Sequence, residues 1–425
     1  YFGGSFGWIL TFIKDRGIGG ETTFWAQQSI STLINPPFAI SLPIFLAGLY
    51  LFHRVLEQKD RVLPFIIPLT ILWGTLIEFK AYAGVLVLLS LAVITLLNLV
   101  KRDLAFLKIS IPTALLSVLV FLPNNLLGGS LLVFSPFWLI HSMIDFPDRL
   151  HVMRLSYSRI VNLQTNNWFK FLGVEFVSLL IFIVGNLGTR TLGLFGFKRL
   201  FANTFGLFIL LFLIFSLTLP LLFIQKGANF NTIQFFYYFI FIFNFLVAYV
   251  LAQLFKKNIK AILIMVATVL LTLPTTYGTL KHYFPARPPS RVSRAELEGL
   301  NFLKRQPDGV VLSFYYDQYL KQRFLEPKPL LVYDSTAYVS ALAAKSEYIS
   351  DTVNLDILGI DYKGRLQLQK DVFAQKDPDL VKQLLKQANI SYIYAPFLSN
   401  FHPNSEKYGL TSIFKNEDVE IYRVD

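Results

Sequence analysis

The sequence has no cysteine in its 425 residues, and only 16% of the residues are charged. Without cysteine, disulfides, thiolate metal sites and cysteine nucleophiles are excluded. Ordinary soluble domains contain about 25% charged residues, so the low charge content excludes a disordered or entirely soluble protein. The chain is instead 54% apolar, with 42 phenylalanines, and its apolar residues form long charge-free runs. Such runs are typical of helices that lie in lipid.

The positive charge is unevenly distributed along the chain. The net charge is +12, and residues 1–280 contain 20 Lys and Arg against 9 Asp and Glu, whereas residues 281–425 contain 19 against 18. The basic excess therefore belongs to the apolar part, where cations beside membrane helices meet anionic lipid. No basic stripe with interleaved aromatic residues occurs in the polar part, so membrane lipids rather than nucleic acid are the expected partner.

Eight apolar segments approach the length of about 20 residues that a membrane-crossing helix needs. They are residues 35–52, 62–77, 81–100, 109–127, 171–189, 200–224, 234–255 and 261–280. Seven of the eight carry no charge, and the fifth contains Glu175, whose carboxylate is costly in lipid unless it has a partner or lies close to water. The sequence predicts an α-helical polytopic membrane protein with about eight transmembrane helices within residues 1–283.

Four short connectors between these segments carry three cations each. The cations are Arg54, Lys59 and Arg61; Lys101, Arg102 and Lys108; Arg190, Lys198 and Arg199; and Lys256, Lys257 and Lys260. With eight spans, all four connectors lie on one side of the membrane, which the positive-inside rule makes cytoplasmic. The chain after the last span is then expected outside the cytoplasm.

The apolar segment 130–144 bears on this topology, because every later connector changes sides if it crosses the membrane. Its 15 residues, at about 1.5 Å each, are too short for the hydrocarbon core, and they include Pro136 and His141. We therefore interpret it as a re-entrant or interfacial segment. Beyond it, Met153 and Tyr157 share an apolar helical face, which predicts an interfacial amphipathic helix.

The composition changes at a proline-rich linker, residues 284–291, and residues 292–425 form a polar tail. Ser293 and Glu296 fit a capping box, and Asp377 followed by proline fits the start of a second helix. The stretches VVLSFYY and ISYIYA are typical of strands, and IFKNEDVEIYRV is typical of a hairpin. The tail is therefore predicted to be a small α/β domain with its own core.

The tail has no nucleotide-binding glycine motif, no nucleophile motif and no cluster of histidine ligands. We expect a domain that is not catalytic by itself. Its most polar stretch, residues 333–351, mixes Tyr, Ser and acidic residues. We interpret it as ordinary strand and turn residues, with a polar ligand surface as the alternative.

Polar residues at the expected outer ends of the spans are the candidate substrate-binding residues. They are Glu78, Lys80, Tyr82, Lys226, Asn229, Asn231 and Gln234. The first three occupy a tight turn, which is interpreted either as an interfacial ion pair or as the lining of an external cavity. The other four precede an aromatic span, and one ammonium with several amides suits a lipid phosphate or the hydroxyls of a sugar.

Two carboxylates, Asp15 and Glu21, lie in the expected external loop before the first span. A general base or a divalent cation site needs such groups, and a solvated loop is the alternative interpretation. No motif indicates any other metal site or cofactor.

Four strings carry a resemblance to a known family: GGSFGWI at 3–9, FWAQQSISTLINPPFAISL at 24–42, FNTIQFFYY at 230–238 and TAYVSALAAKSEYISD at 336–351. On these the sequence resembles the polytopic bacterial glycosyltransferases of the GT-C type. The resemblance implies that many spans enclose an external cavity and that an extracytoplasmic C-terminal domain follows. It also implies that a sugar moves from a polyprenyl-phosphate carrier to an acceptor in the cell envelope.

The family's signature acidic residues lie in the first external loop, between the first two spans. We expect this loop to precede Tyr1, in a chain truncated at its N-terminus, so the catalytic carboxylate stays unassigned and Asp15 and Glu21 are its substitutes. The resemblance implies a single displacement, in which Lys226 first and Lys80 second steady the departing lipid phosphate. The alternatives are a non-catalytic accessory protein and a transporter or flippase in lipid-linked glycan assembly.

Overall fold

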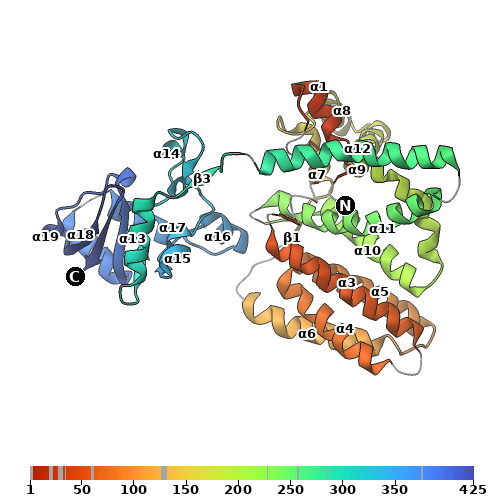
Figure 1. The fold of residues 1–425 in the computed structure, drawn as a ribbon, viewed down its shortest axis with the longest axis horizontal. Helices are drawn as coiled ribbons and strands as arrows, with labels where there is room; N and C mark the ends of the chain where they lie inside the picture. Colours follow the sequence, from red (N-terminus) through yellow and green to blue (C-terminus); the bar gives the residue numbers. More distant parts are fainter. Residues whose placement is uncertain are drawn as a thin grey trace. The chain divides into compact units, whose positions relative to one another are not determined.

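The computed structural model describes residues 3–18, 23–26, 32–33, 35–58, 62–125, 132–226, 228–255, 258–284, 286–374 and 377–425. The chain divides into two compact units, Tyr1–Phe284 and Pro285–Asp425, and the division falls at the predicted linker. We call the first the membrane unit and the second the tail domain. The membrane unit is a bundle of helices, and the tail domain is a sheet covered by helices (Figure 1).

Among the described residues, six helical stretches of the membrane unit are long and apolar enough to cross a membrane. They are α3 (Pro36–Glu57), α5 (Ala81–Val100), α9 with the 3-10 helix η1 (Trp168–Leu187 and Gly188–Phe201), α10 (Thr204–Leu222), η2 with α11 (Asn229–Thr232 and Ile233–Phe255) and α12 (Ile259–Tyr283). Two further apolar helices are shorter, α4 (Leu63–Phe79) and α6 (Leu107–Asn125). The chain is therefore a helical membrane protein, and the predicted spans 62–77 and 109–127 correspond to its two shorter helices.

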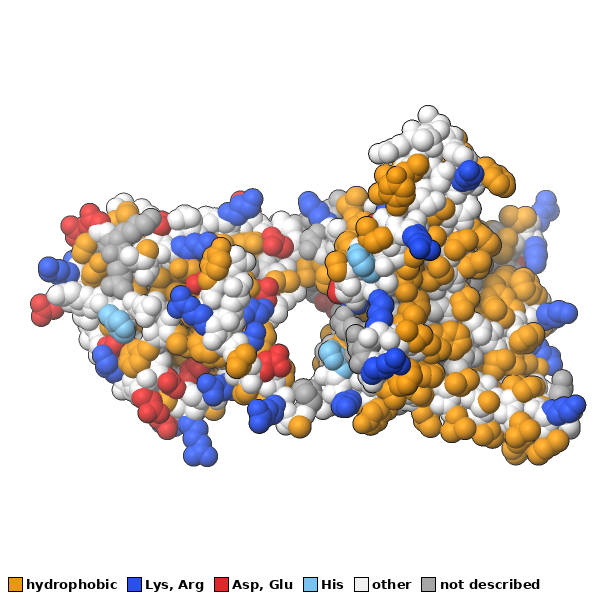
Figure 2. Space-filling model, turned by 90° about the horizontal axis from the view of Figure 1, so that it is seen from above, with side chains coloured by type: hydrophobic (Ala, Val, Ile, Leu, Met, Phe, Trp, Pro, Cys, Tyr) orange, Lys and Arg blue, Asp and Glu red, His pale blue; other side chains and the backbone are white. Residues whose placement is uncertain are grey.

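The bundle has two distinct ends. Helices α3, α5 and α11 begin at one end, where α4, α10 and α12 finish (Figure 1). We call this the linker end, because the linker follows α12, and the opposite end the basic end. The described cations at the basic end are Arg54, Lys101, Arg102, Lys108, Lys198, Arg199 and Lys260. Apolar side chains cover much of the visible surface of the membrane unit, whereas both signs of charge are mixed over the tail domain (Figure 2).

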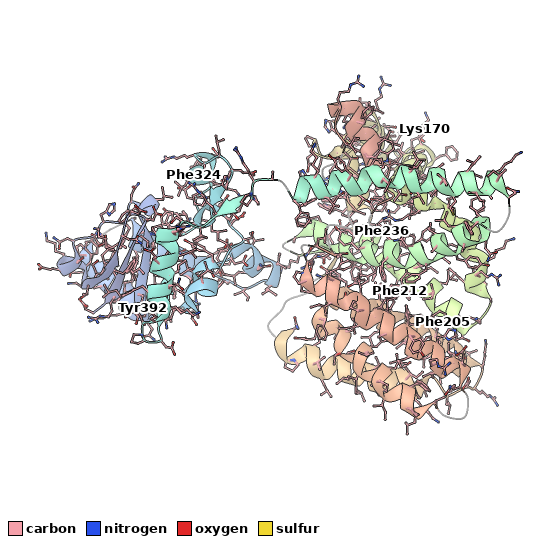
Figure 3. All side chains as sticks on the ribbon, in the orientation of Figure 1. Lys170, Phe205, Phe212, Phe236, Phe324 and Tyr392 are labelled. Atoms are coloured by element: carbon pink, nitrogen blue, oxygen red, sulfur yellow. The ribbon has the colours of Figure 1, made fainter. Side chains whose placement is uncertain are left out.

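Buried aromatic rings hold α3, α4 and α10 together. Trp73 stacks on Phe208 with ring centroids 5.1 Å apart, and Phe45 stacks on Phe212 at 4.6 Å. Phe212 lies within the bundle (Figure 3). Gly48 allows this approach, since a Cβ atom there would lie 1.9 Å from Trp73 Nε1. The absence of a side chain at Gly48 therefore allows α3 and α4 to pack closely together.

The segment predicted to be re-entrant or interfacial does not form a long helix. Strand β1 (Leu132–Phe134) pairs antiparallel with β2 (Phe223–Gln225), and α7 (Trp138–Asp145) has eight residues. Neither element is long enough to cross a membrane. The next helix, α8 (Met153–Gln164), leaves the apolar side chains of Met153, Tyr157 and Ile160 exposed. This exposed apolar face fits the predicted interfacial helix.

The prediction that Arg190 lies in a basic connector is wrong. Helix η1 continues α9 without a break, and Arg190 is buried, with Nε donating a hydrogen bond to Asn244 Oδ1 at 3.0 Å. Asn244 lies about 17 Å along α11 from its start, at about 1.5 Å per residue. Arg190 therefore lies beside the middle of the 23-residue helix α11.

Residues 3–5 are buried, and Gly4 lies beside Arg190. The carbonyl oxygen of Gly4 accepts a hydrogen bond from Thr189 N at 2.8 Å, and Ser5 O accepts one from Thr275 Oγ1 at 2.8 Å. Gly188 has a φ of +54°, and a Cβ there would lie 1.8 Å from Gly4 O. The first residues thus join η1 to α12, and helix α1 (Gly7–Asp15) follows them.

The tail domain contains a five-stranded sheet in the order β6–β4–β7–β9–β8. The strands are β4 (Val310–Leu312), β6 (Ser346–Glu347), β7 (Ile390–Pro396), β8 (Leu410–Lys415) and β9 (Val419–Val424). Strand β4 is parallel to both β6 and β7, and β8 and β9 form the predicted antiparallel hairpin. The domain is therefore a small α/β fold, as predicted.

Helices cover both faces of this sheet. Buried residues of α13 (Arg294–Lys304) and α15 (Tyr338–Ala343) form one core with Val311, and those of α17 (Lys363–Phe373) and α18 (Pro378–Gln387) form another with Leu312. The predicted helix caps are confirmed, since Ser293 Oγ accepts from Glu296 N at 2.9 Å and the Asp377 side chain accepts from Asp379 N at 3.0 Å. The remaining elements are β3 (Ser290–Arg291), α14 (Gln318–Gln322), β5 (Lys328–Pro329), η3 (Leu330–Val332), α16 (Thr352–Leu358), η4 (Phe397–Ser399) and α19 (Ser405–Tyr408).

Candidate functional site

A continuous chain of polar side chains connects several helices at the linker end of the bundle. We call it the amide network, and its members are Asn35, Lys80, Tyr82, Gln225, Asn231 and Gln234. Lys80 Nζ donates a hydrogen bond to Asn35 Oδ1 at 3.4 Å. The amide of Asn35 in turn donates to Gln234 Oε1 at 3.3 Å. These contacts connect the start of α3 with the turn between α4 and α5 and with the first turn of α11.

The second half of the network connects α11 to β2 and α5. Gln234 Nε2 donates to Asn231 Oδ1 at 2.5 Å, and Asn231 Nδ2 donates to Gln225 Oε1 at 3.1 Å. The same Gln225 oxygen accepts from the Tyr82 hydroxyl at 2.6 Å. Gln225 and Gln234 are each 9% exposed. Hydrogen bonds therefore hold the side chains of the network in place, and all six are partly or fully buried.

Local sequence explains how these side chains are presented. Asn35 is the N-cap of α3, where its Oδ1 also accepts from Phe38 N at 3.2 Å, and Pro36 occupies the first helical position. Lys80 is the single residue between α4 and α5, in an extended conformation that ends the first helix. Tyr82 and Gln234 lie in the first turns of their helices. Asn35, Lys80, Tyr82 and Gln234 are thus positioned by helix ends, whereas Gln225 ends β2 and Asn231 lies in η2.

Lys80 is the one ionisable cation of the amide network, which contains no carboxylate. Burial lowers the pKa of its ammonium to about 8, so the group stays mostly protonated at neutral pH. The ammonium also lies 5.4 Å from the centroid of the Tyr82 ring. The network therefore presents one positive charge among amide donors and acceptors.

The structure brings together four of the seven predicted binding residues, namely Lys80, Tyr82, Asn231 and Gln234. Lys226 and Asn229 have exposed side chains next to the network, and Glu78 is exposed at the end of α4. Of the two predicted carboxylates, Glu21 and the side chain of Asp15 lie outside the described residues.

Asn35 was missed by the sequence reasoning, although its position directly before two prolines is a recognisable N-cap signal. The ranking of Lys226 above Lys80 also rested on local sequence. The geometry favours Lys80, because its ammonium is hydrogen-bonded within the network.

A second polar pair lies near the same end of the bundle. His141 Nε2 of α7 is 2.8 Å from Glu175 Oε1 of α9, and Glu175 is 8% exposed. Phe182 packs on Phe236 near the start of α11, with ring centroids 5.2 Å apart. Glu175 precedes Phe182 by about two helical turns, or about 10 Å, which takes it to the linker end. Glu175 therefore has a partner, which is one of the two conditions under which a carboxylate in this span is tolerated.

No group of three or more His, Asp or Glu side chains that would hold a metal ion occurs in the described part of the chain. Comparison with known proteins finds no family model that matches the chain and no curated protein that is similar to it. Fold and site together define a helical membrane protein with a buried, singly charged polar network at one end. Its function has to be inferred from that geometry.

Proposed function

We propose that this chain is a membrane glycosyltransferase that moves a sugar from a polyprenyl-phosphate carrier to an acceptor outside the cytoplasm. The observation that carries the proposal is the ammonium of Lys80 held within the amide network at the linker end. A phosphate is bound well by one cation together with neutral hydrogen-bond donors, and amides and a tyrosine hydroxyl also bind sugar hydroxyls. The surrounding helices offer apolar surface for the lipid tail.

The cations of the short connectors support an orientation of the bundle in the membrane. Seven described cations lie at the basic end, which supports a cytoplasmic location for that end. The linker end and the tail domain are then extracytoplasmic. Because Arg190 is buried, one of the four connectors carries two cations instead of three. The four connectors still lie at the same end of the bundle.

The proposed reaction is a single displacement at the anomeric carbon. An acceptor hydroxyl forms the new bond to this carbon, the bond from carbon to the phosphate oxygen breaks, and the phosphate leaves with the bonding electrons. Lys80 stabilises the negative charge on the departing phosphate. The acceptor proton requires a general base, and the pair of Glu175 and His141 supplies a carboxylate and an imidazole near the same end.

The test uses the chain in lipid nanodiscs and measures its affinity for polyprenyl phosphate. Lys80→Gln is expected to weaken binding about tenfold, which corresponds to about 1.4 kcal/mol, whereas Lys80→Arg retains the charge and most of the affinity. Lys170→Gln is the matched control, because Lys170 is an exposed cation in the first turn of α9. Lys226→Gln tests the prediction from the sequence that Lys226, rather than Lys80, is the main contact of the phosphate.

Two results contradict the proposal. If Lys80→Gln binds polyprenyl phosphate with wild-type affinity and keeps the wild-type thermal midpoint, the amide network has no role in phosphate binding. A loss in Lys226→Gln alone moves the phosphate site to the exposed loop. Transfer of radiolabelled sugar from a polyprenyl-phosphate donor then measures activity directly, and Glu175→Gln is expected to reduce the transfer rate by about a hundredfold.

A lipid flippase is the second candidate function, and Arg190 is the observation that favours it. Arg190 is buried within the bundle, and a charge buried among membrane helices is typical of transport pathways. A flippase moves labelled polyprenyl phosphate across the bilayer of a proteoliposome, and Arg190→Gln would stop that movement. The glycosyltransferase proposal expects no movement above that of protein-free vesicles.

A further inference from the structure

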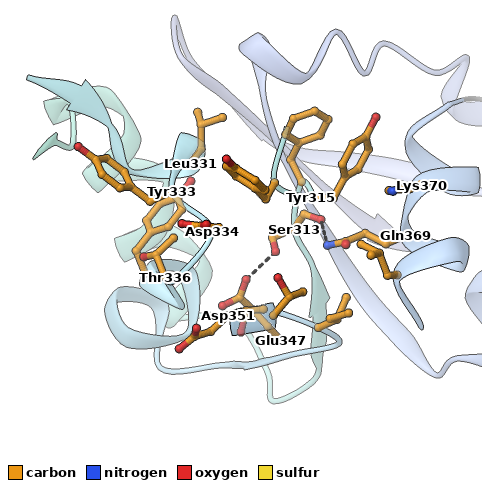
Figure 4. Close-up of a pocket in the computed structure, with 17 residues that line it drawn as sticks. Ser313, Tyr315, Leu331, Tyr333, Asp334, Thr336, Glu347, Asp351, Gln369 and Lys370 are labelled. Atoms are coloured by element: carbon orange, nitrogen blue, oxygen red, sulfur yellow. Dashed lines mark hydrogen bonds between the residues drawn. The ribbon is translucent and has the colours of Figure 1, made fainter. Parts of the chain in front are cut away.

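The tail domain contains a pocket of about 210 Å³ at the C-terminal ends of two parallel strands. Residues that follow β4, residues that precede α15, residues of β6 and the start of α16, and residues of α17 line it. Their side chains converge on one space from opposite sides (Figure 4). The pocket thus combines segments that are far apart in the sequence.

The topology of the sheet explains why a pocket forms at this point. The chain leaves β4 through α15 on one face of the sheet, and it leaves β6 through α16, α17 and α18, of which α17 and α18 pack on the other face. Two neighbouring parallel strands whose connections diverge leave a crevice at their C-terminal ends. Open α/β sheets bind ligands at such crevices.

The floor of the pocket is held in place by hydrogen bonds. Ser313 Oγ donates to Glu347 Oε1 at 2.5 Å, and Ser340 N donates to Glu347 Oε2 at 3.0 Å. Gln369, which is 3% exposed, donates through Nε2 to Ser313 O at 2.7 Å. The dashed lines in Figure 4 mark the two contacts of Ser313. The pocket therefore has a rigid polar base.

The walls combine tyrosine rings with carboxylates. Tyr333, Asp334 and Thr336 line one side, and Tyr315 lies across from them, toward Gln369 and Lys370. Asp351 lies beside the N-terminus of α16. Asp334 Oδ1 is 3.9 Å from Lys321 Nζ, an ion pair that is longer than a hydrogen bond. These walls offer ring faces for C–H groups and carboxylate oxygens for O–H groups.

We propose that this pocket binds one sugar ring of a glycan. Three carboxylates and one ammonium, that of Lys370, line the pocket, and this excess of negative charge disfavours an anionic ligand. The polar walls disfavour an apolar ligand. Its volume is below the range of about 300–1,000 Å³ that is typical of larger ligands. A neutral ring that carries several hydroxyls satisfies both the tyrosine faces and the carboxylates. The inference goes beyond the proposed function, because binding here requires no transfer step.

The experiment measures the binding of methyl glycosides of glucose, galactose, mannose and N-acetylglucosamine to the whole chain in nanodiscs, without any lipid-linked donor. Titration calorimetry gives the dissociation constants, and saturation-transfer NMR identifies the bound sugar. At least one glycoside is expected to bind. Thr336→Val and Asp334→Asn should each weaken that binding by about tenfold, because each removes a hydrogen-bonding group with little change of shape.

Three further variants make the result decisive. Thr336→Ser keeps the hydroxyl and is expected to retain wild-type affinity, which separates lost recognition from a misfolded domain. Glu298→Gln removes an exposed carboxylate on α13 and is expected to change nothing. Lys80→Gln should also leave glycoside binding intact, since Lys80 belongs to the membrane unit. Failure of the transferase proposal is thus distinguishable from failure of this one.

The inference is overturned if none of the four glycosides binds, or if both pocket variants bind as tightly as the wild type. Inorganic phosphate is the competing probe. If phosphate binds in the wild type and Asp334→Asn strengthens that binding, the pocket is an anion site and the assignment to a sugar is wrong.

Discussion

In the membrane unit the buried polar side chains are mostly hydroxyls and amides, whereas three of the five buried polar side chains of the tail domain are ionisable. Many hydroxyls in the bundle bond to the backbone of their own helix, as Ser90 Oγ does to Leu86 O at 2.7 Å and Thr113 Oγ1 to Ile109 O at 2.7 Å. The hydroxyls that bond within their own helix have a hydrogen-bond partner before the helices pack together. In lipid, where water is absent, this local satisfaction keeps the cost of burial low.

The tail domain satisfies its buried charges through contacts between distant segments. Glu296 of α13 accepts hydrogen bonds from the hydroxyl of Tyr338 at 2.7 Å and from that of Tyr394 at 3.1 Å. Lys345 donates to Gln306 O at 2.8 Å. Stability of the tail domain is therefore expected to respond to pH, and stability of the bundle to packing. Each prediction below tests one side of this difference.

The largest effect is expected from Gly48→Val in the bundle. Any Cβ at this position meets the ring of Trp73, which is fully buried and stacked on Phe208, so the ring has little room to move. We expect a loss of about 3 kcal/mol or more, or failure to reach the membrane in folded form. The thermal midpoint and monodispersity of the purified protein measure it. Gly173→Ala in α9, where nothing lies within 4 Å of the added atom, is the control and should behave as the wild type.

The next prediction concerns Arg190, which with Glu175 is an exception among the polar groups buried in the described part of the bundle. Asn244→Leu removes the acceptor of its Nε hydrogen bond while keeping the volume similar. We expect a destabilisation of about 1–3 kcal/mol, because the hydrogen bond involves a charged donor in a buried site. The midpoint of thermal unfolding in nanodiscs measures it. An unchanged midpoint would mean that the Arg190 guanidinium does not need its hydrogen bond to Asn244 of α11. Arg190 would then no longer be an example of a polar group in the bundle that depends on a distant segment.

Arg190 also shows where sequence reasoning fails. Counting cations beside apolar runs treats each as solvated, and Lys198 and Arg199 fit that rule. Whether a helix continues past an arginine depends on a partner, and the partner here is Asn244, far along the chain. The same reason explains why the partner of Glu175, His141, was not predicted. Partners of this kind are set by tertiary packing, which hydropathy does not describe.

Much else was predictable from local patterns. Long apolar runs predicted the helices, and the caps at Ser293 and Asp377 predicted two helix starts in the tail domain. The meeting of Lys80, Tyr82 and Gln234 was partly predictable, because alternating spans bring their ends to one side. Their hydrogen-bond partners were not, since Asn35 and Gln225 reach the network through the packing of α3 and β2. The pocket of the tail domain likewise depends on strand order.

The smallest effect, and the sharpest test of the comparison, comes from Glu296. Burial is the main cause that raises the pKa of its carboxyl, and nearby Asp418 raises it further, while the hydroxyls of Tyr338 and Tyr394 oppose the change. A carboxyl whose pKa is higher in the folded state binds its proton more tightly there, so its stabilising contribution is complete below the unfolded value of about 4.3 and is lost as the pH rises through the folded value. Glu296→Gln mimics the protonated form and keeps an oxygen for the two tyrosines. Thermal unfolding of the tail domain, followed within the whole chain, should therefore depend less on pH in Glu296→Gln than in the wild type, while the transition of the bundle keeps the same pH dependence in both. An equal slope in the two proteins would show that other groups control the response of the tail domain to pH.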